Sequence, residues 1–437
     1  MQLAVEKEKD TMRGRISAFL QLFFSQPYLY ALFALIALKP RALCEVDELL
    51  ASVLGIAEFP LFRTATYGIV ALVFACYLLR WIIGDIRRTN PTLLCILGMF
   101  LYLALITFVF DGASGYHIDW HAGFALMMMI DMGLQRERES LLRGLTGAFE
   151  FWIYLNVCSF ILFPQSMCED IWTPEWILGN RVFYYRIVFP ALALALVRYH
   201  VLGKAWLVRT ALLTAGCLIC FYVQRGGTAL IGLAVLLALL LWCNRRALPR
   251  YLMPLWFTAL AAAGFAGIYF FDAQKLFEPL IVDVLGKSIT LSSRTVVWDA
   301  VIPLIVKNPV SGVGYLPVMY LHEILGGSTF SHTHNQLLLL MLHGGAIATI
   351  LYLAALYFAS REAVRCRRSP AVKVMALLTC VFAIMGISEI FHNDPIYYAL
   401  FIFLSRADCL TEGVRQLPRI SVMKRIGRDL KKKKATV

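Results

Sequence analysis

The chain has 437 residues, of which 60% are hydrophobic and only 16% are charged, and its mean hydropathy is +0.70. These values exclude a soluble globular protein, in which about a quarter of the residues are charged. The net charge of +13 would suggest a nucleic-acid-binding protein if the chain were soluble, so its meaning depends on where the basic residues lie.

Apolar stretches long enough to cross about 30 Å of hydrocarbon recur along the whole chain. We therefore predict a single all-α, polytopic membrane domain over residues 1–437, with about 12 transmembrane helices and both termini in the cytoplasm. The expected spans are 17–38, 64–84, 92–110, 118–135, 147–164, 182–198, 205–223, 226–243, 251–271, 334–359, 372–390 and 395–409.

The distribution of lysine and arginine tests this topology, because short cytoplasmic loops hold an excess of both. With these spans, 31 of the 41 basic residues fall on the side of the two termini. Lys7, Lys9, Arg13 and Arg15 precede the first span, which we expect to stay uncleaved because no small-residue cleavage site follows it. The basic tail over residues 410–437 is expected in the cytoplasm, either solvated or associated with anionic lipid.

Two connections on the other side of the membrane are unusually long, 165–181 and 272–333. Cys168 in the first connection and Cys44 are the cysteines expected outside, and a disulfide between them is left open because sequence gives no distance. The second connection joins the ninth and tenth spans and is too long to be a simple linker. We therefore expect the functional residues to lie in and around it.

This long connection is expected to contain short amphipathic helices. Ser292 or Ser293 can cap a helix that Asn308-Pro309 ends, and Arg294 falls in its first turn. One face of this helix carries Val297, Val301, Leu304 and Ile305, with Trp298 beside them. Such a helix would lie on the outer membrane surface, and the glycines of the following SGVG segment would give a flexible return.

Ionisable side chains are costly in hydrocarbon and therefore indicate function where they occur. In this chain they avoid the expected middle of the membrane and gather at outer helix ends, at Asp111, Arg181, Arg186, Arg225, His334, Glu389, His392 and Asp394. The absence of a ladder of charges across the expected spans favours a reaction at the external surface over a transporter or proton pump.

Arg225 lies in the sequence QRGG, in a tight connection between two expected spans. Gly226 and Gly227 would let a ligand approach the backbone N–H groups at the start of the next helix. These groups and a guanidinium together form a site for an anion such as phosphate. The alternative is that Arg225 contacts lipid phosphates, as any interfacial arginine can.

His334 opens the tenth span in the sequence SHTHNQ, with Ser331 and Thr333 as candidate caps. The positive end of a helix disfavours imidazolium, so a neutral His334 can accept a proton as a general base. One alternative is an interfacial histidine without a catalytic role. Another is a metal site, but His332 and His334 have no evident set of further ligands and His343 lies on the opposite helix face, so we predict no metal.

Three motifs in this order resemble the O-antigen ligase and polymerase superfamily: QRGG, SSRTVVWDAVIPLIVKNPVSGVG and HTHNQLLLLMLHGG. The family pattern of His-Asn, nine residues and Gly matches His334, Asn335 and Gly345, and the chain departs from the usual residue at Ala348. The resemblance implies a fold similar to that of the GT-C membrane glycosyltransferases. It identifies Arg225 and Arg294 as the essential arginines and His334 as the essential histidine.

The resemblance further implies an O-antigen ligase of the bacterial inner membrane, active on the periplasmic side in lipopolysaccharide biosynthesis. Such ligases transfer a polysaccharide from undecaprenyl pyrophosphate to a sugar hydroxyl of lipid A-core and need neither metal nor nucleotide. For this chain we accordingly expect no cofactor and no nucleic-acid partner, and we expect the lipid-linked donor, lipid A-core and membrane lipids as its partners. Two guanidiniums would bind the pyrophosphate, and His334 would accept the proton in a direct, inverting displacement. Weaker substrate contacts are expected from Arg181, Arg186, His332, Asn335 and Trp298, and Glu389 and Asp394 rank behind His334 as bases.

Three alternatives stay open. A polymerase of the same superfamily uses the same donor, but the polymerase pattern of Arg, ten residues and Gly does not occur here: counting from Arg181, Arg186, Arg225 and Arg294 reaches Leu192, Val197, Leu236 and Ile305. A protein O-glycosylating ligase shares the donor and the histidine motif. A non-catalytic transporter or flippase for lipid-linked sugars belongs to a different functional class.

Overall fold

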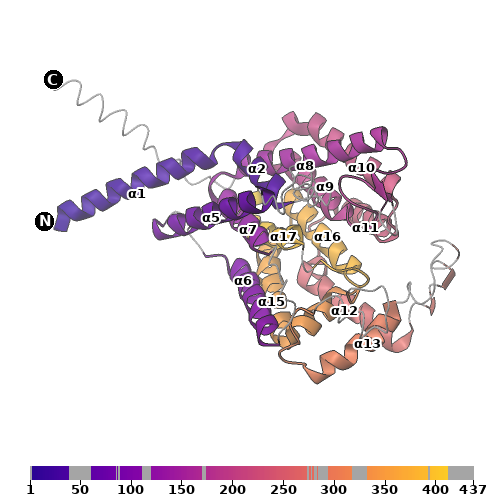
Figure 1. Ribbon diagram of the computed structural model, residues 1–437. Coiled ribbons are helices and arrows are strands. Elements are labelled where there is room, and N and C mark those ends of the chain that lie inside the picture. The colour runs from indigo at the N-terminus through magenta and orange to yellow at the C-terminus, as the bar shows by residue number, and fades with distance from the viewer. Residues whose placement is uncertain are drawn as a thin grey trace, which may run out of the picture.

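The computed structural model describes residues 2–38, 61–84, 86, 89–110, 120–169, 174–272, 275–276, 278–279, 283, 294–316, 332–391 and 394–411. Helices make up nearly all of the regular structure in these ranges (Figure 1). The elements are α1 (Gln2–Phe24), α2 (Pro27–Ala37), α5 (Leu61–Ile82), α6 (Pro91–Val109), α7 (Trp120–Arg136), α8 (Arg138–Leu162), β1 (Cys168–Glu169), β2 (Pro174–Glu175), α9 (Tyr185–Leu202), η1 (Lys204–Trp206), α10 (Leu207–Gln224), α11 (Gly227–Cys243), η2 (Arg250–Leu252), α12 (Pro254–Phe271), α13 (Arg294–Lys307), α15 (Gln336–Arg365), α16 (Pro370–Met385), α17 (Pro395–Ser405) and η5 (Ala407–Leu410).

The all-α, polytopic membrane class predicted from the sequence is confirmed. Within the described ranges, seven helices are long and apolar enough to cross a membrane, and the bent pair of α1 and α2 would make an eighth. Each expected span coincides with a helix, but α7, α11, α16 and α17 have only 17, 17, 16 and 11 residues. The count of 12 spans is therefore not confirmed, and the GT-C likeness stays a prediction.

The first expected span, 17–38, is two helices rather than one. α1 and α2 are bent by 68° at the break between them. Pro27 stands at the first position of α2, and it explains the break: proline has no N–H to continue α1, while its fixed φ fits the first turn of a new helix. α1 consequently projects from the rest of the bundle (Figure 1).

The centre of the bundle is formed by α16 and α17. α16 packs against α9, α11, α12 and α17, and α17 packs against α7 and α15. Every residue of α16 from Ala371 to Phe382 is buried, because the helix is apolar on all sides and has a neighbour on each of them. The connection between α16 and α17, which includes residues 386–391, is thus held by a rigid core at both of its ends.

Three buried ion pairs, which the sequence pattern does not predict, join neighbouring helices. They join Arg80 to Glu137 at 2.9 Å, Arg406 to Asp131 at 2.7 Å and Arg198 to Glu150 at 2.7 Å. A buried charge that loses its partner costs about 3–5 kcal/mol, so each pair fixes how its helices pack. Glu150 lies at the middle of α8 and Asp131 lies inside α7, so the expectation that charges gather at outer helix ends does not cover these two residues.

The expected loop 165–181 contains a small two-stranded sheet, in which β1 and β2 are antiparallel. Gln224 Nε2 donates to the Gly179 carbonyl oxygen at 2.7 Å, and the Leu178 N–H donates to Asn156 Oδ1 at 3.0 Å. The loop is therefore docked on α8 and α10. Cys44 and the side chain of Cys168 lie outside what the structure describes, so their disulfide stays a prediction.

α13 confirms the amphipathic helix expected in the long connection 272–333, of which the structure describes chiefly residues 294–316. Its face of Val297, Trp298, Val301 and Ile305 is buried. Phe265 of α12 packs edge-on against Trp298, with the ring centroids 4.8 Å apart, and α15 completes the cluster. The candidate caps Ser292 and Ser293 lie outside the described residues. α13 is thus fixed to two membrane helices.

Gly144 allows close contact between α8 and α2, because a Cβ there would lie 2.2 Å from the Pro27 carbonyl oxygen and 2.5 Å from Tyr30 Cβ. Gly144→Ala should force the helices apart and lower the free energy of unfolding by about 1–3 kcal/mol. Gly147→Ala on the same helix is the control, since a Cβ there meets nothing within 4 Å. Thermal unfolding in detergent compares them, and equal midpoints would contradict the packing.

Candidate active site

Arg294, in the first turn of α13, binds a carboxylate from a distant part of the chain. Its Nη2 lies 3.1 Å from Oε1 of Glu389, in the segment 386–391 that follows α16. Thr228, in the first turn of α11, donates from Oγ1 to the same oxygen at 3.3 Å. The Arg294 and Glu389 side chains are only 19% and 8% exposed, so solvent screens their attraction weakly. Three chain segments converge on this carboxylate.

His334 lies just before α15, in a tight turn over residues 332–335. Its φ is +49°, a left-handed conformation that is costly for a non-glycine residue unless its surroundings hold it. The Asn335 N–H donates to Thr333 Oγ1 at 3.3 Å, and this hydroxyl donates to the Asn335 carbonyl oxygen at 2.8 Å. Trp298 Nε1 donates to the Thr333 carbonyl oxygen at 3.0 Å. α13 therefore holds the histidine turn directly.

The N-cap of α15 is Asn335 rather than Thr333. Its side-chain oxygen accepts a hydrogen bond from the Leu338 N–H at 2.9 Å, and α15 begins at Gln336. The helix therefore begins two residues after His334, the start expected from the sequence. The reason is that asparagine is as good an N-cap as serine or threonine, and apolar periodicity does not fix a cap position. Ser331 lies outside the described residues.

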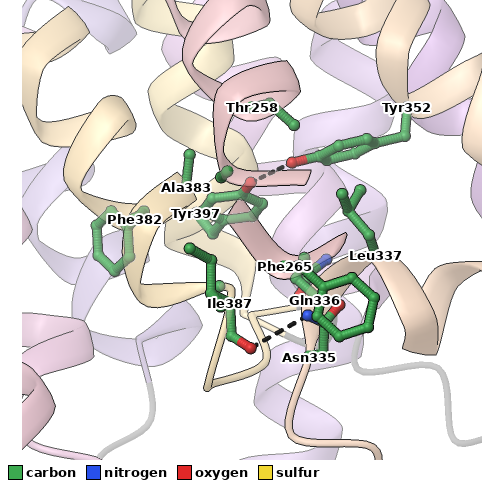
Figure 2. Close-up of a pocket in the computed structure, with 12 residues that line it drawn as sticks. Thr258, Phe265, Asn335, Gln336, Leu337, Tyr352, Phe382, Ala383, Ile387 and Tyr397 are labelled. Carbon is green, nitrogen blue, oxygen red and sulfur yellow. Dashed lines mark hydrogen bonds between the residues drawn. The ribbon is translucent and has the colours of Figure 1, made fainter. Parts of the chain in front are cut away.

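The start of α15 is also tied to the segment that carries Glu389. Asn335 Nδ2 donates to the Ile387 carbonyl oxygen at 3.1 Å (Figure 2). The Gln336 N–H donates to the Gly386 carbonyl oxygen at 2.9 Å, and Gln336 Oε1 accepts from the Phe391 N–H at 2.6 Å. The arginine, the histidine and the glutamate therefore lie on one hydrogen-bonded framework.

Both histidines of the turn are kept neutral by their surroundings. Burial lowers the pKa of His332 to about 4, and the charges of Arg186 and Arg294 contribute. Burial is also the largest cause of the strongly lowered pKa of His334, followed by His332 and Arg294. The two rings lie 4.0 Å apart between centroids. Neither ring is therefore an imidazolium at neutral pH.

Arg186, in the first turn of α9, belongs to the same cluster. Its Cζ lies 5.9 Å from the Phe391 ring centroid, next to the glutamate segment. Burial raises the pKa of Glu389, and the charges of Arg294 and Arg186 oppose this rise. Burial likewise raises the pKa of Asp394, again opposed by Arg186. We name Arg186, Arg294, His332, His334 and Glu389 the site cluster.

Arg225 lies beside the site cluster, but its guanidinium is directed elsewhere. Its backbone ends α10 with φ +41°. Its Nε donates to the Tyr222 carbonyl oxygen at 3.0 Å, and its Cζ lies 5.0 Å from the Tyr222 ring centroid. Arg181 is exposed, and its carbonyl oxygen packs against Gly226. Among the described contacts, Thr228 brings the QRGG hairpin to the cluster and neither guanidinium does.

Two further residues expected to touch substrate have other positions. Trp298 is fully buried, so it supports the histidine turn from behind instead of presenting a surface to a substrate. Asn335 is also buried, and its side chain is occupied by the cap and by Ile387. Both residues were predicted to contact substrate, whereas they stabilise the histidine turn and the start of α15. An amphipathic pattern or a motif position does not distinguish a supporting residue from one that contacts substrate.

Figure 2 shows a small cavity on the inner side of Asn335 and Gln336, between α12, α15, α16 and α17. Its volume is about 20 Å³, enough for about one water molecule. It is therefore too small for a sugar or a lipid chain. Within the ranges that the structure describes, no group of three or more His, Cys, Asp or Glu side chains could hold a metal ion.

A family model described as O-antigen ligase matches residues 210–353. Over these residues the chain is similar to the O-antigen ligase family. No curated protein matches the chain. The matched region includes Arg225, Arg294 and His334, the three residues on which the sequence resemblance rested. That resemblance is confirmed at the level of the superfamily, while the roles of the three residues stay predictions.

The site cluster extends beyond the matched region on both sides, to Arg186 and Glu389. Sequence analysis considered Glu389 only as a substitute base and missed it as the partner of Arg294. Its position at an outer helix end was a signal of function. Its pairing with a residue 95 positions away depends on packing, which no local pattern contains.

Asn335→Ala should remove both the cap of α15 and the bond to Ile387, and lower the free energy of unfolding by about 1–3 kcal/mol. Asn335→Ser keeps an oxygen for the cap and loses only the bond to Ile387, so a smaller loss is expected. Thermal unfolding of both variants in detergent measures the difference. A serine variant as unstable as the alanine variant would contradict the capping role.

Proposed function

We propose that the protein is an O-antigen ligase that transfers a polysaccharide from undecaprenyl pyrophosphate to a sugar hydroxyl of lipid A-core, at the periplasmic face of the bacterial inner membrane. The family match supports a membrane glycosyltransferase of the ligase and polymerase type. The proposal rests chiefly on one observation, the convergence of Arg294, His334 and Glu389 on a single framework. The donor and the acceptor are those that the resemblance implies.

An external location of the site is supported by the position of the charges along α17. This helix begins next to the site cluster, at its N-cap Asp394, and ends at Arg406 in a buried ion pair. The site cluster and that ion pair are thus at opposite ends of one helix. Because basic residues concentrate on the cytoplasmic side, the site cluster would face the periplasm.

In the proposed reaction, the acceptor oxygen forms a bond to the anomeric carbon while the bond from this carbon to the pyrophosphate oxygen breaks. The electron pair leaves with the pyrophosphate, and the hydroxyl proton passes to His334. Arg294 would bind the negative charge that grows on the leaving group, and Arg186 could supply a second guanidinium. Arg225, the other arginine implied by the resemblance, would have to turn away from Tyr222 to join them.

The strongly lowered pKa makes His334 a weak base, and a bound donor would change this. A bound pyrophosphate brings negative charge that offsets Arg294, which raises the pKa of His334. The pyrophosphate also competes with Glu389 for the Arg294 guanidinium. Since burial already raises the pKa of Glu389, this carboxylate can take up a proton and release the arginine. The site would therefore become basic only with the donor in place.

A polymerase is the second candidate, because the matched family does not separate ligases from polymerases. It would use the same cluster and donor with a lipid-linked oligosaccharide as acceptor.

Purified protein with lipid-pyrophosphate glycan and lipid A-core should give a larger lipid A-core conjugate. A longer lipid-linked polymer would instead support the polymerase, a glycosylated acceptor protein would support a protein ligase, and no product with any acceptor would support a transporter or flippase.

His334→Ala and Arg294→Ala should each reduce transfer by at least about 10²-fold, since they remove the proposed base and the contact to the leaving group. Arg294→Lys keeps the positive charge but cannot form bidentate hydrogen bonds to phosphate, so an intermediate loss of transfer is expected. Arg361→Ala, at an exposed arginine in the last turns of α15, is the control. Transfer by purified protein measures all four, and full activity of His334→Ala would remove the base assignment.

The pH dependence of transfer should differ between the free protein and the donor complex. Burial lowers the pKa of His334 far below its ordinary value of 6.5, so without the donor its basic form persists as the pH falls through 6. The ratio kcat/KM, which reports free protein, should thus decline at a lower pH than kcat, which reports the complex. Initial rates across the acidic range test this, and coincident acid limbs would contradict the proposed effect of the donor.

A further inference from the structure

α15 is broken at Gly345, the glycine that completes the His-Asn motif. This residue has φ +57° and ψ −153°, which is not helical. It stands nine residues after the helix start at Gln336, roughly 14 Å along the axis. A break at such a depth frees backbone N–H and C=O groups, and hydrocarbon cannot bind them. The protein itself must therefore supply their partners.

The chain that follows α13 supplies them. We name residues 309–315 the return segment. Four backbone hydrogen bonds cross between this segment and the break: Val313 N–H to Leu342 O and Gly314 N–H to His343 O, each at 2.9 Å, Ala346 N–H to Pro309 O at 2.9 Å and Ile347 N–H to Val310 O at 3.3 Å. In an unbroken helix the two α15 donors would bind the two α15 acceptors. The return segment thus provides the partners that the two missing helical hydrogen bonds would have provided.

Glycines on both sides make this fit. A Cβ on Gly345 would lie 2.4 Å from the Val310 carbonyl oxygen, and a Cβ on Gly312 would lie 2.5 Å from the Gly344 nitrogen. Both Gly345 and Gly312 have positive φ, which other residues adopt only at a cost. The two glycine-containing motifs of the sequence, SGVG and HGG, therefore meet at one point.

The return segment is also bound to α6 on its other side. Tyr102 donates from its hydroxyl to the Ser311 carbonyl oxygen at 3.0 Å. The Tyr315 N–H donates to Thr107 Oγ1 at 2.9 Å, and a Cβ on Gly314 would lie 2.6 Å from Thr107 Cα. The segment is consequently fixed between two membrane helices, instead of forming the flexible return that its glycines suggested.

We propose that the return segment is a positioning element for Arg294, an inference that rests on the proposed function for the part of that arginine in catalysis. α13 has 14 residues and runs about 20 Å from the return segment to Arg294. A tilt of about 5° at the return segment would move Arg294 by about 2 Å. That is enough to break its 3.1 Å contact with Glu389. The Trp298 bond to Thr333 is a second contact of α13, nearer to Arg294, and it limits the size of such a tilt.

The first test measures the position of Arg294 without any transfer reaction. In Gly345→Ala the added Cβ should displace the return segment, and Arg294 should separate from Glu389 and react several-fold faster with an arginine reagent such as phenylglyoxal. Tyr102→Phe, which removes one hydroxyl donor and keeps the packing, should give a smaller increase if Gly345→Ala does not fold. Gly147→Ala is the control. Peptide mass spectrometry measures modification of Arg294, and unchanged labelling in both test variants overturns the proposal.

The second test measures transfer in a double-mutant cycle. Gly345→Ala alone should reduce kcat by about 10²-fold, the scale of a misplacement of about 1 Å. Combined with Arg294→Lys, it should cost much less than the product of the two single effects, because both act through one guanidinium. Independent effects would overturn the positioning. Faster labelling of Arg294 together with full activity of Arg294→Ala would leave the positioning intact and remove the proposed function.

Discussion

Hydrocarbon offers no hydrogen-bond partner to a backbone N–H or C=O group, and this constraint organises the region around the site cluster. The break in α15 persists because the return segment provides four partners. The start of α15 is stable because Asn335 caps it and the Gly386 carbonyl oxygen accepts the Gln336 N–H. The same bonds that satisfy the backbone also set the spacing of the arginine, the histidine and the glutamate. The hydrogen bonds that satisfy the backbone therefore also determine the geometry of the site cluster.

The charges at the two ends of the bundle are arranged differently. At one end, carboxylates such as Glu137 and Asp131 each have a closely bound arginine, and the pairs are nearly neutral. At the other end, two guanidiniums surround Glu389, whose pKa is raised by burial and which can lose its charge. Asp394 also lies near Arg186, and burial raises the pKa of this carboxyl too. The carboxyls at this end are therefore easier to protonate than ordinary carboxylates, which would let the guanidiniums change partners.

Sequence patterns predicted much of this architecture. Each span expected from hydropathy contains a helix in the structure. The apolar period of α13 likewise predicted its buried face. Both predictions depend only on residue type and local spacing. The bend at Pro27 was missed because one long apolar stretch hides a break. The links between α13, α15 and the Glu389 segment were out of reach, since they join residues far apart in sequence. The motif showed a glycine at position 345 but not its partner.

The order in which the chain is made has a consequence for how the break in α15 can assemble. Domains fold from the N-terminus onward during synthesis. α6 and the return segment both precede α15 in the chain. The return segment and α6 are therefore already synthesised when α15 enters the membrane. The unpaired carbonyl groups of α15 can thus find partners before the later helices are made. The segment between α16 and α17 then adds its contacts to Asn335 and Gln336.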